Sequence, residues 1–204
     1  MKITHLIMKN MKIAIGGSAA NPMHYGHRQL LEMIIGLKEF DKVYWIISGE
    51  RLDKPGLPDS FHRWQMAKML TKNLFLNLNY EKGLSVPTFY VIKNFQKKFP
   101  AAEIVWYCGS DHFIPRQKFN DLCDVEAFWH KGEWLMENQK FLIVKRKGLG
   151  AEDMHYPKNF VLLEANIPEI SSTMIRKRIM NGLDNVQYTS IEVLNYIKEN
   201  QIYP

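Results

Sequence analysis

Short apolar segments alternate with amphipathic segments along nearly all of the 204-residue chain. Continuous apolar runs, typical of strands buried on both faces, predict strands at residues 12–15, 43–48, 74–80, 103–108, 141–145 and 160–163. Apolar residues at helical spacing predict helices at residues 27–39, 61–72, 88–99, 172–180 and 190–199. This alternation predicts an α/β fold with a doubly wound parallel sheet and helices at the C-terminal end.

The composition limits the classes of protein to which the chain can belong. A chain of 204 residues is usually one domain, and 46% hydrophobic residues are enough for a sizeable core. We expect this domain over residues 11–204, preceded by an N-terminal extension, residues 1–10. The true start, Met1 or Met11, stays open. Two cysteines are too few for a disulfide framework, and no apolar run approaches the ~20 residues that span a membrane. We therefore expect a cytoplasmic protein with no membrane partner. The net charge of +6 suits an anionic partner, either a polyphosphate or a nucleic acid.

Ligands of a parallel sheet bind beyond the carboxyl ends of its strands, so the loops after the first and fourth strands matter most. In the first loop, residues 16–27, Gly16 and Gly17 predict a tight turn and a close approach of backbone to ligand. The helix that follows offers unpaired N–H groups to a phosphate. His24 and His27 can each donate a hydrogen bond to phosphate and stabilise a leaving pyrophosphate. The alternative is a glycine turn with two surface histidines.

A second motif, Ile-Ser-Ser-Thr-Met-Ile-Arg, occupies residues 170–176 and opens a predicted helix. A Ser or Thr caps this helix, which leaves backbone N–H groups for a phosphate. Arg176 adds a fixed positive charge with several donors. Taken alone, the motif also fits an ordinary capped helix.

The two motifs together resemble the signatures of the HIGH-type nucleotidyltransferase superfamily and, within it, the bacterial nicotinate-nucleotide adenylyltransferases. One departure is the pair Ala19-Ala20, which stands where that family has a single Phe. The resemblance implies a Rossmann-like fold and adenylyl transfer from ATP to nicotinate mononucleotide. The products would be deamido-NAD and pyrophosphate, in NAD biosynthesis, and Mg²⁺ would arrive bound to ATP.

The resemblance also implies a set of site residues. Those implied for catalysis are His24, His27, Lys54 and Arg176. Those implied for ATP binding are Gly16, Gly17, Ser18, His24, His27, Gly109, Asp111, Ser172, Thr173 and Arg176. Those implied for the mononucleotide are Lys54, Thr88, Phe119 and Arg146.

Several of these positions have an alternative interpretation. Lys54 stands where the family often has a His-Lys pair, and a solvated surface lysine fits equally well. Asp111 could cap a helix. Phe119 takes the place of a Trp that stacks on the pyridine ring in the family. Trp129 and Trp134 follow in an insertion, residues 121–139, where one could replace that Trp or both could pack the insertion.

Other functions stay open at this point. The acceptor could be nicotinamide mononucleotide or phosphopantetheine. The altered first loop and Phe119 also allow a nucleotide-binding protein without catalysis. A basic nucleic-acid-binding domain ranks last, because no RRM, KH or helix-turn-helix pattern is present. We expect ATP and a pyridine mononucleotide as partners, without nucleic acid; the oligomeric state stays open, a homo-oligomer included.

Overall fold

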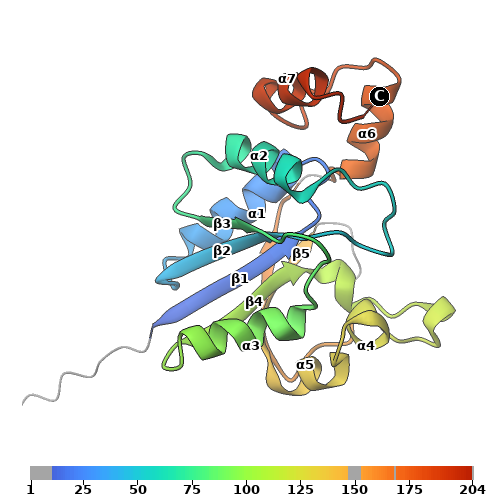
Figure 1. The fold of residues 1–204 in the computed structure, drawn as a ribbon. Coiled ribbons are helices and arrows are strands. Elements are labelled where there is room, and N and C mark those ends of the chain that lie inside the picture. The colour runs from blue at the N-terminus through green and yellow to red at the C-terminus, as the bar shows by residue number, and fades with distance from the viewer. Residues whose placement is uncertain (1–10, 147–152, 168, 204) are drawn as a thin grey trace, which may run out of the picture.

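The computed structural model describes residues 11–146, 153–167 and 169–203, so the expected extension at residues 1–10 lies outside the described part. Six parallel strands form one sheet in the order β3-β2-β1-β4-β5-β6 (Figure 1). The strands are β1 (Lys12–Ser18), β2 (Lys42–Ile47), β3 (Asn77–Tyr80), β4 (Glu103–Gly109), β5 (Lys140–Arg146) and β6 (Asn159–Ala165). Strand order reverses between β1 and β4, which confirms the predicted doubly wound, Rossmann-like sheet.

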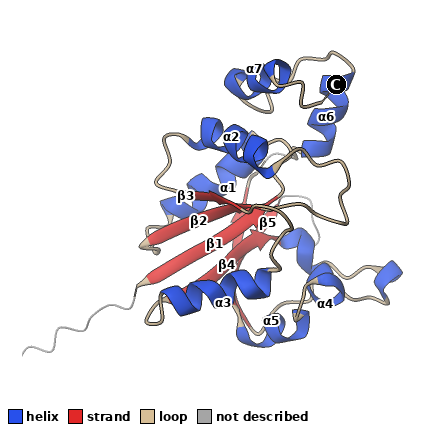
Figure 2. Ribbon diagram, viewed as in Figure 1, coloured by secondary structure: helices blue, strands red, loops and turns tan. Residues whose placement is uncertain are grey.

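Helices cover both faces of the sheet. They are α1 (Tyr25–Gly36), α2 (Ser60–Thr71), α3 (Thr88–Lys98), α4 (Asp124–Phe128), α5 (Gly132–Asn138), α6 (Ser172–Met180) and α7 (Ile191–Glu199), with 3-10 turns η1 (Ser110–Phe113) and η2 (Gln117–Phe119). α1 and α2 lie on one face and α3 to α5 on the other, while α6 and α7 lie beyond α2 (Figure 2). None of the described helices is long and apolar enough to cross a membrane.

Several predicted boundaries shift by a few residues in the structure. The third strand begins at Asn77 and not at residue 74. The N–H of Leu74 donates to the carbonyl of Thr71 and closes a turn after α2, and the N–H of Leu76 donates to the carbonyl of Leu74, so these residues bond locally and not to β2. The first helix begins at Tyr25, two residues before the predicted start.

The core has two layers, one on each face of the sheet. Successive β1 residues alternate between them: Ile13 and Ile15 pack toward α3, and Ala14 packs toward α1. The insertion belongs to the α3 side, where the Trp129 ring meets Trp106 edge-on at 6.3 Å and Trp134 meets Phe89 at 5.2 Å. These two tryptophans therefore pack the insertion against β4 and α3.

Gly16 and Gly17 lie within β1, so the prediction that they form a tight turn is wrong. A Cβ atom at Gly16 would lie 2.5 Å from the Tyr107 ring, and one at Gly17 would lie 2.5 Å from the carbonyl oxygen of Ile46. Close packing inside the sheet requires both glycines. The chain turns after β1, where Ala20 adopts a left-handed conformation with φ of 46°.

Candidate active site

A cavity of about 440 Å³ lies at the carboxyl end of β1. Three segments line it: the first loop with His27, the loop after β2 (residues 54–57), and the first turn of α6. Its basic side chains are His27, Lys54 and Arg176, and none of its lining residues is Asp or Glu. The cavity therefore favours an anion.

The two histidines form the beginning of α1. His24 is its N-cap and is only 3% exposed, so the surface-histidine alternative is wrong for this residue. The backbone N–H of His24 donates to His27 Nδ1 at 3.3 Å, and the two rings lie 3.7 Å apart. This bond assigns the proton of a neutral His27 ring to Nε2, which lies 3.5 Å from Ser18 Oγ at the cavity wall. His27 therefore presents an N–H donor to the cavity.

The carbonyl groups of the first loop are held by side chains from distant parts of the chain. Four carbonyls between residues 19 and 23 each accept one hydrogen bond of 2.7 to 2.9 Å. The pairs are Arg63 Nη1 with Ala19, Arg176 Nη1 with Asn21, Ser172 Oγ with Pro22, and Thr189 Oγ1 with Met23. The loop is thus held from behind, which fixes the wall of the cavity.

The start of α6 confirms the predicted cap. Ser171 is the N-cap and its hydroxyl accepts from the Met174 N–H at 3.1 Å. Thr173 Oγ1 accepts from Arg176 Nη2 at 3.3 Å, so the guanidinium links the helix start to the first loop. Ser172, Thr173 and Arg176 all line the cavity, as the second motif predicts for residues of one site.

Lys54 lines the cavity from the loop after β2 and is exposed to solvent. Desolvation lowers the pKa of Lys54, and the positive charges of Arg51 and Arg176 lower it further, against the effects of Asp53 and Asp111. Lys54 and Arg176 thus line the same cavity, and the positive charge of Arg176 acts on the amine of Lys54.

The residues predicted at the end of β4 lie next to the cavity and not in its lining. Gly109 ends β4 and is the N-cap of η1, so the interpretation of Asp111 as an N-cap is wrong. Asp111 lies in the first turn of η1, close enough for its carboxylate to raise the pKa of Lys54. Contact of either residue with ATP stays a prediction.

Of the residues predicted for the mononucleotide, Lys54 lines the cavity, whereas Thr88 and Phe119 do not. Thr88 begins α3 after the N-cap Pro87. The Phe119 ring packs edge-on against Phe128 at 4.5 Å, with Lys118 Nζ 4.6 Å from its centre. Arg146 ends β5, and the prediction for its side chain lies outside the described residues.

Two residues that support the site were given no role in it from the sequence. Arg63 is 1% exposed and donates to four carbonyls on the loops after β1 and β2. The hydroxyl of Tyr203, close to the C-terminus, donates to the side chain of Asn21 in the cavity wall. The available signal for Arg63 was the Arg-x-x-Met segment at residues 63–66, which the resembled family also has in a helix.

A second cavity, of about 290 Å³, lies at the opposite end of the sheet. It is lined by the first residues of four strands, Lys12, Glu103, Lys140 and Asn159, together with apolar side chains. Ligands of doubly wound sheets bind at the carboxyl ends of the strands, so we assign the chemistry to the first cavity.

Comparison with known proteins agrees with this geometry. Residues 15–178 match the model of the cytidylyltransferase-like family. The chain is 26% identical to the nicotinate-nucleotide adenylyltransferase of Bacillus subtilis over 94% of this chain and 98% of that protein. It is 26% identical to the probable nicotinate-nucleotide adenylyltransferase of Carboxydothermus hydrogenoformans over 96% of this chain and 100% of that protein. The fold is similar to that of the Plasmodium falciparum nicotinic acid mononucleotide adenylyltransferase complexed with NaAD, with a TM-score of 0.76 and 20% sequence identity. The similarity covers 95% of this chain and 97% of that chain.

Proposed function

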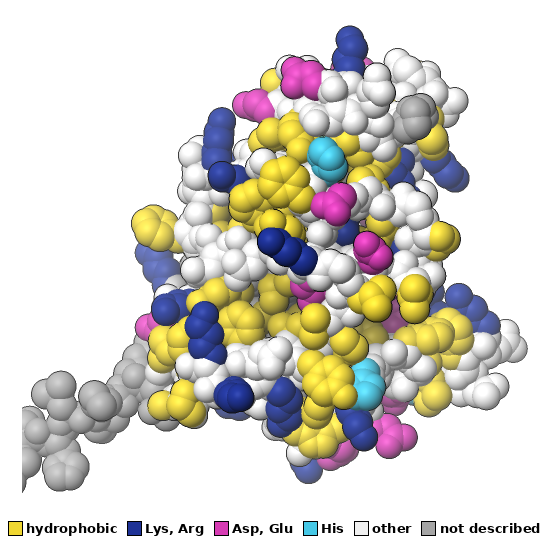
Figure 3. Space-filling model, viewed as in Figure 1, with side chains coloured by type: hydrophobic (Ala, Val, Ile, Leu, Met, Phe, Trp, Pro, Cys, Tyr) yellow, Lys and Arg dark blue, Asp and Glu magenta, His cyan; other side chains and the backbone are white. Residues whose placement is uncertain are grey.

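Because this chain belongs to the cytidylyltransferase-like family, we propose that it transfers the adenylyl group of ATP to nicotinate mononucleotide, forming deamido-NAD and pyrophosphate. The observation that carries the proposal is the cavity with three basic side chains and no acidic one. Its relatives named nicotinate-nucleotide adenylyltransferase match this chain over nearly their whole length. On the face shown in Figure 3, Lys and Arg side chains are spread among other types and form no continuous basic stripe.

The proposed reaction needs charge stabilisation more than acid–base chemistry. A phosphate oxygen of the mononucleotide attacks the α-phosphorus of ATP in line, and the bond from that phosphorus to the β-phosphate oxygen breaks. Pyrophosphate leaves with the bonding electrons. The attacking phosphate is already an anion near neutral pH, since its second pKa is about 6, so no general base is required. Positioning and electrostatics carry such transfers.

Each part of the cavity has a place in this scheme. The Nε2–H of His27 would donate to phosphate oxygens as negative charge grows on the leaving group. His24, buried behind it, would hold the His27 ring in that orientation. Arg176 and the first N–H groups of α6 would bind the phosphate chain, and Lys54 would bind it from the loop after β2.

Magnesium fits this cavity as an ion carried by ATP. The lining residues offer no carboxylate for a protein-built cage, and Mg²⁺ commonly keeps phosphate and water ligands. When bound, the ion would neutralise charge on the phosphate chain, while the protein side chains hold that chain in place.

The test is a pyrophosphate-release assay with MgATP and a panel of acceptors: nicotinate mononucleotide, nicotinamide mononucleotide and phosphopantetheine. We expect pyrophosphate and a dinucleotide product when nicotinate mononucleotide is present, and no release with ATP alone. Binding of ATP without product from any acceptor would favour a nucleotide-binding protein that lacks catalysis.

Lys54 gives the proposed activity a specific pH dependence. Only the protonated amine can bind phosphate by charge, so kcat/KM for MgATP should fall as pH rises through the lowered pKa of Lys54. The alkaline limb should therefore lie below the ordinary lysine pKa of ~10.4. Lys54→Met should lower kcat/KM and remove this limb, while Lys54→Arg should move it to higher pH. An unchanged profile in Lys54→Met would make Lys54 a surface residue.

We expect nicotinate mononucleotide to be preferred over the amide. α3 begins at Thr88 without a side-chain cap, so its first N–H groups can meet a carboxylate. Glu81 positions the preceding loop, because its Oε2 accepts from Gly49 N, Ser85 Oγ and Val86 N. A site that offers only donors leaves the amide NH₂ unpaired, at a cost of ~1–3 kcal/mol, or about one to two orders of magnitude in kcat/KM. Equal kcat/KM values for the two acceptors would contradict the preference and leave the transfer chemistry intact.

A further inference from the structure

Three side chains with metal-binding atoms meet away from the cavity and have no part in the proposed transfer. Cys123 is the N-cap of α4, Glu126 lies in the first turn of that helix, and His155 belongs to the connection between β5 and β6. One ligand atom from each residue lies within 4.8 Å of the other two. Sulfur, oxygen and nitrogen donors from two separate segments therefore share one point in space.

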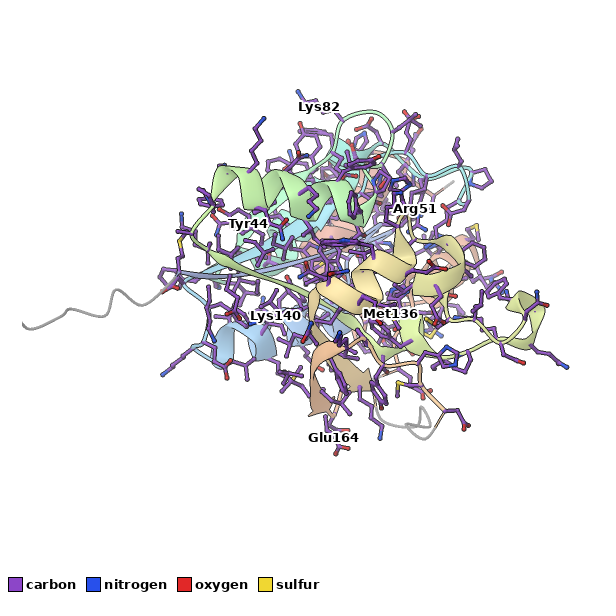
Figure 4. The ribbon with its side chains drawn as sticks, turned by 90° about the horizontal axis from the view of Figure 1, so that it is seen from below. Tyr44, Arg51, Lys82, Met136, Lys140 and Glu164 are labelled. Atoms are coloured by element: carbon purple, nitrogen blue, oxygen red, sulfur yellow. The ribbon has the colours of Figure 1, made fainter. Side chains whose placement is uncertain are left out.

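The surrounding contacts hold these side chains in place. Glu126 Oε2 accepts from the Cys123 N–H at 2.9 Å and lies 2.7 Å from His155 Nδ1. The backbone N–H of His155 donates to the carbonyl of Phe113 at 2.9 Å, which fixes the histidine against η1. α4 also packs against α5, the helix that carries Met136 in Figure 4. The group is thus supported from several elements.

The group has a buried side and an open side. Cys123 is fully buried, and burial raises the pKa of its thiol to about 11. The side chain of Glu126 is 24% exposed to solvent, and that of His155 is 40% exposed. An ion can therefore reach the carboxylate and the imidazole from solvent, and the buried thiol lies within 4.8 Å of their ligand atoms.

We propose that Cys123, Glu126 and His155 form a binding site for Zn²⁺. Zinc binds sulfur at ~2.3 Å and nitrogen or oxygen at ~2.0–2.2 Å, so its ligand atoms lie roughly 3–4 Å apart and small side-chain rotations suffice here. Thiolate and imidazole favour zinc over magnesium. This site is therefore distinct from the magnesium that ATP would carry, and it does not depend on the proposed function.

Binding exchanges protons for the metal. The thiol proton of Cys123 and any proton between His155 Nδ1 and Glu126 pass to solvent. Sγ, Nδ1 and a carboxylate oxygen each then donate an electron pair to Zn²⁺, and water completes a tetrahedral set from the open side. The metal would cross-link the insertion to the connection before β6.

Cobalt titration of the full chain, stripped of metal with a chelator, tests the site. Co²⁺ should bind with one equivalent and produce a near-ultraviolet thiolate-to-cobalt charge-transfer band, which Zn²⁺ should abolish by competition. Cys123→Ser should lose the band, and Cys108→Ser, which changes the other buried cysteine, should keep it. His155→Gln should weaken zinc binding by more than the ~10–100-fold typical of an outer-shell partner.

Thermal unfolding gives a second readout. Zn²⁺ should raise Tm by several degrees in the native chain and in Cys108→Ser, and should leave Tm of His155→Gln nearly unchanged. If Cys123→Ser does not fold, the partly exposed His155→Gln decides the question. Absence of the band in the native chain, or equal zinc affinity in His155→Gln, would overturn the proposal and leave a capping interaction with an ion pair.

Discussion

Replacement of His27 by Asn should lower kcat for pyrophosphate release by ~10²–10³. In the folded chain His27 uses Nδ1 to accept from His24 N–H, and it presents Nε2–H to the cavity. The amide oxygen of Asn can replace Nδ1 as acceptor, but the shorter side chain cannot place a donor where Nε2 lies. The variant therefore separates the proposed role in catalysis from the role at the helix start. Steady-state kinetics at saturating MgATP and acceptor measure the effect.

Two further variants complete this experiment. His27→Ala should lose the same factor in kcat and, in addition, ~0.5–2 kcal/mol of stability, because the acceptor for His24 N–H is gone. His62→Asn is the matched control: His62 bonds to the Tyr196 hydroxyl at 2.8 Å, outside the cavity lining, and should keep kcat. Native kcat in a folded His27→Asn would make His27 a structural residue.

The strands and helices were largely predictable because their signal is local. The apolar run at residues 103–108 and the helical spacing at residues 172–180 each fall on an element of nearly the same bounds, β4 and α6. One error arises where a side chain decides the boundary. His24 caps α1 through its contact with His27, and this moves the helix start to Tyr25.

The candidate site was predictable only in part, because its support comes from distant residues. The motifs identified Ser172 and Arg176, and both lie at the cavity. Their hydrogen bonds to the carbonyls of Pro22 and Asn21 join segments about 150 residues apart in the chain, which no local pattern encodes. The position of Phe119 likewise depends on the path of the chain, which turns through left-handed conformations directly after that residue.

Arg63→Met should be strongly destabilising, although Arg63 binds no acidic partner at salt-bridge distance among the described residues. Its buried guanidinium donates to the carbonyls of Pro58, Ala19, Ser48 and Gly49 at 2.7 to 3.1 Å. Methionine keeps much of the volume and removes every donor, and each buried acceptor left unsatisfied costs ~1–3 kcal/mol. Because some of these carbonyls can regain water, we expect a total loss of about 3–5 kcal/mol, or a fall in Tm of roughly 10 °C.

Arg28→Met is the matched control for this prediction, since it removes an arginine that also donates to a carbonyl, that of Leu70, at 2.7 Å. Arg28 keeps 29% of its exposure and lies outside the cavity lining, so its loss should cost under ~1 kcal/mol and leave kcat unchanged. Arg63→Met should also have a lower kcat than the native chain at temperatures well below the Tm of the variant. The reason is that Ala19 and the loop after β2 would no longer be held together at the cavity. Thermal unfolding and activity of both variants, measured side by side, decide the matter. Equal Tm values would show that the four carbonyls are satisfied without Arg63, and a large fall in Tm with native kcat would limit Arg63 to stability.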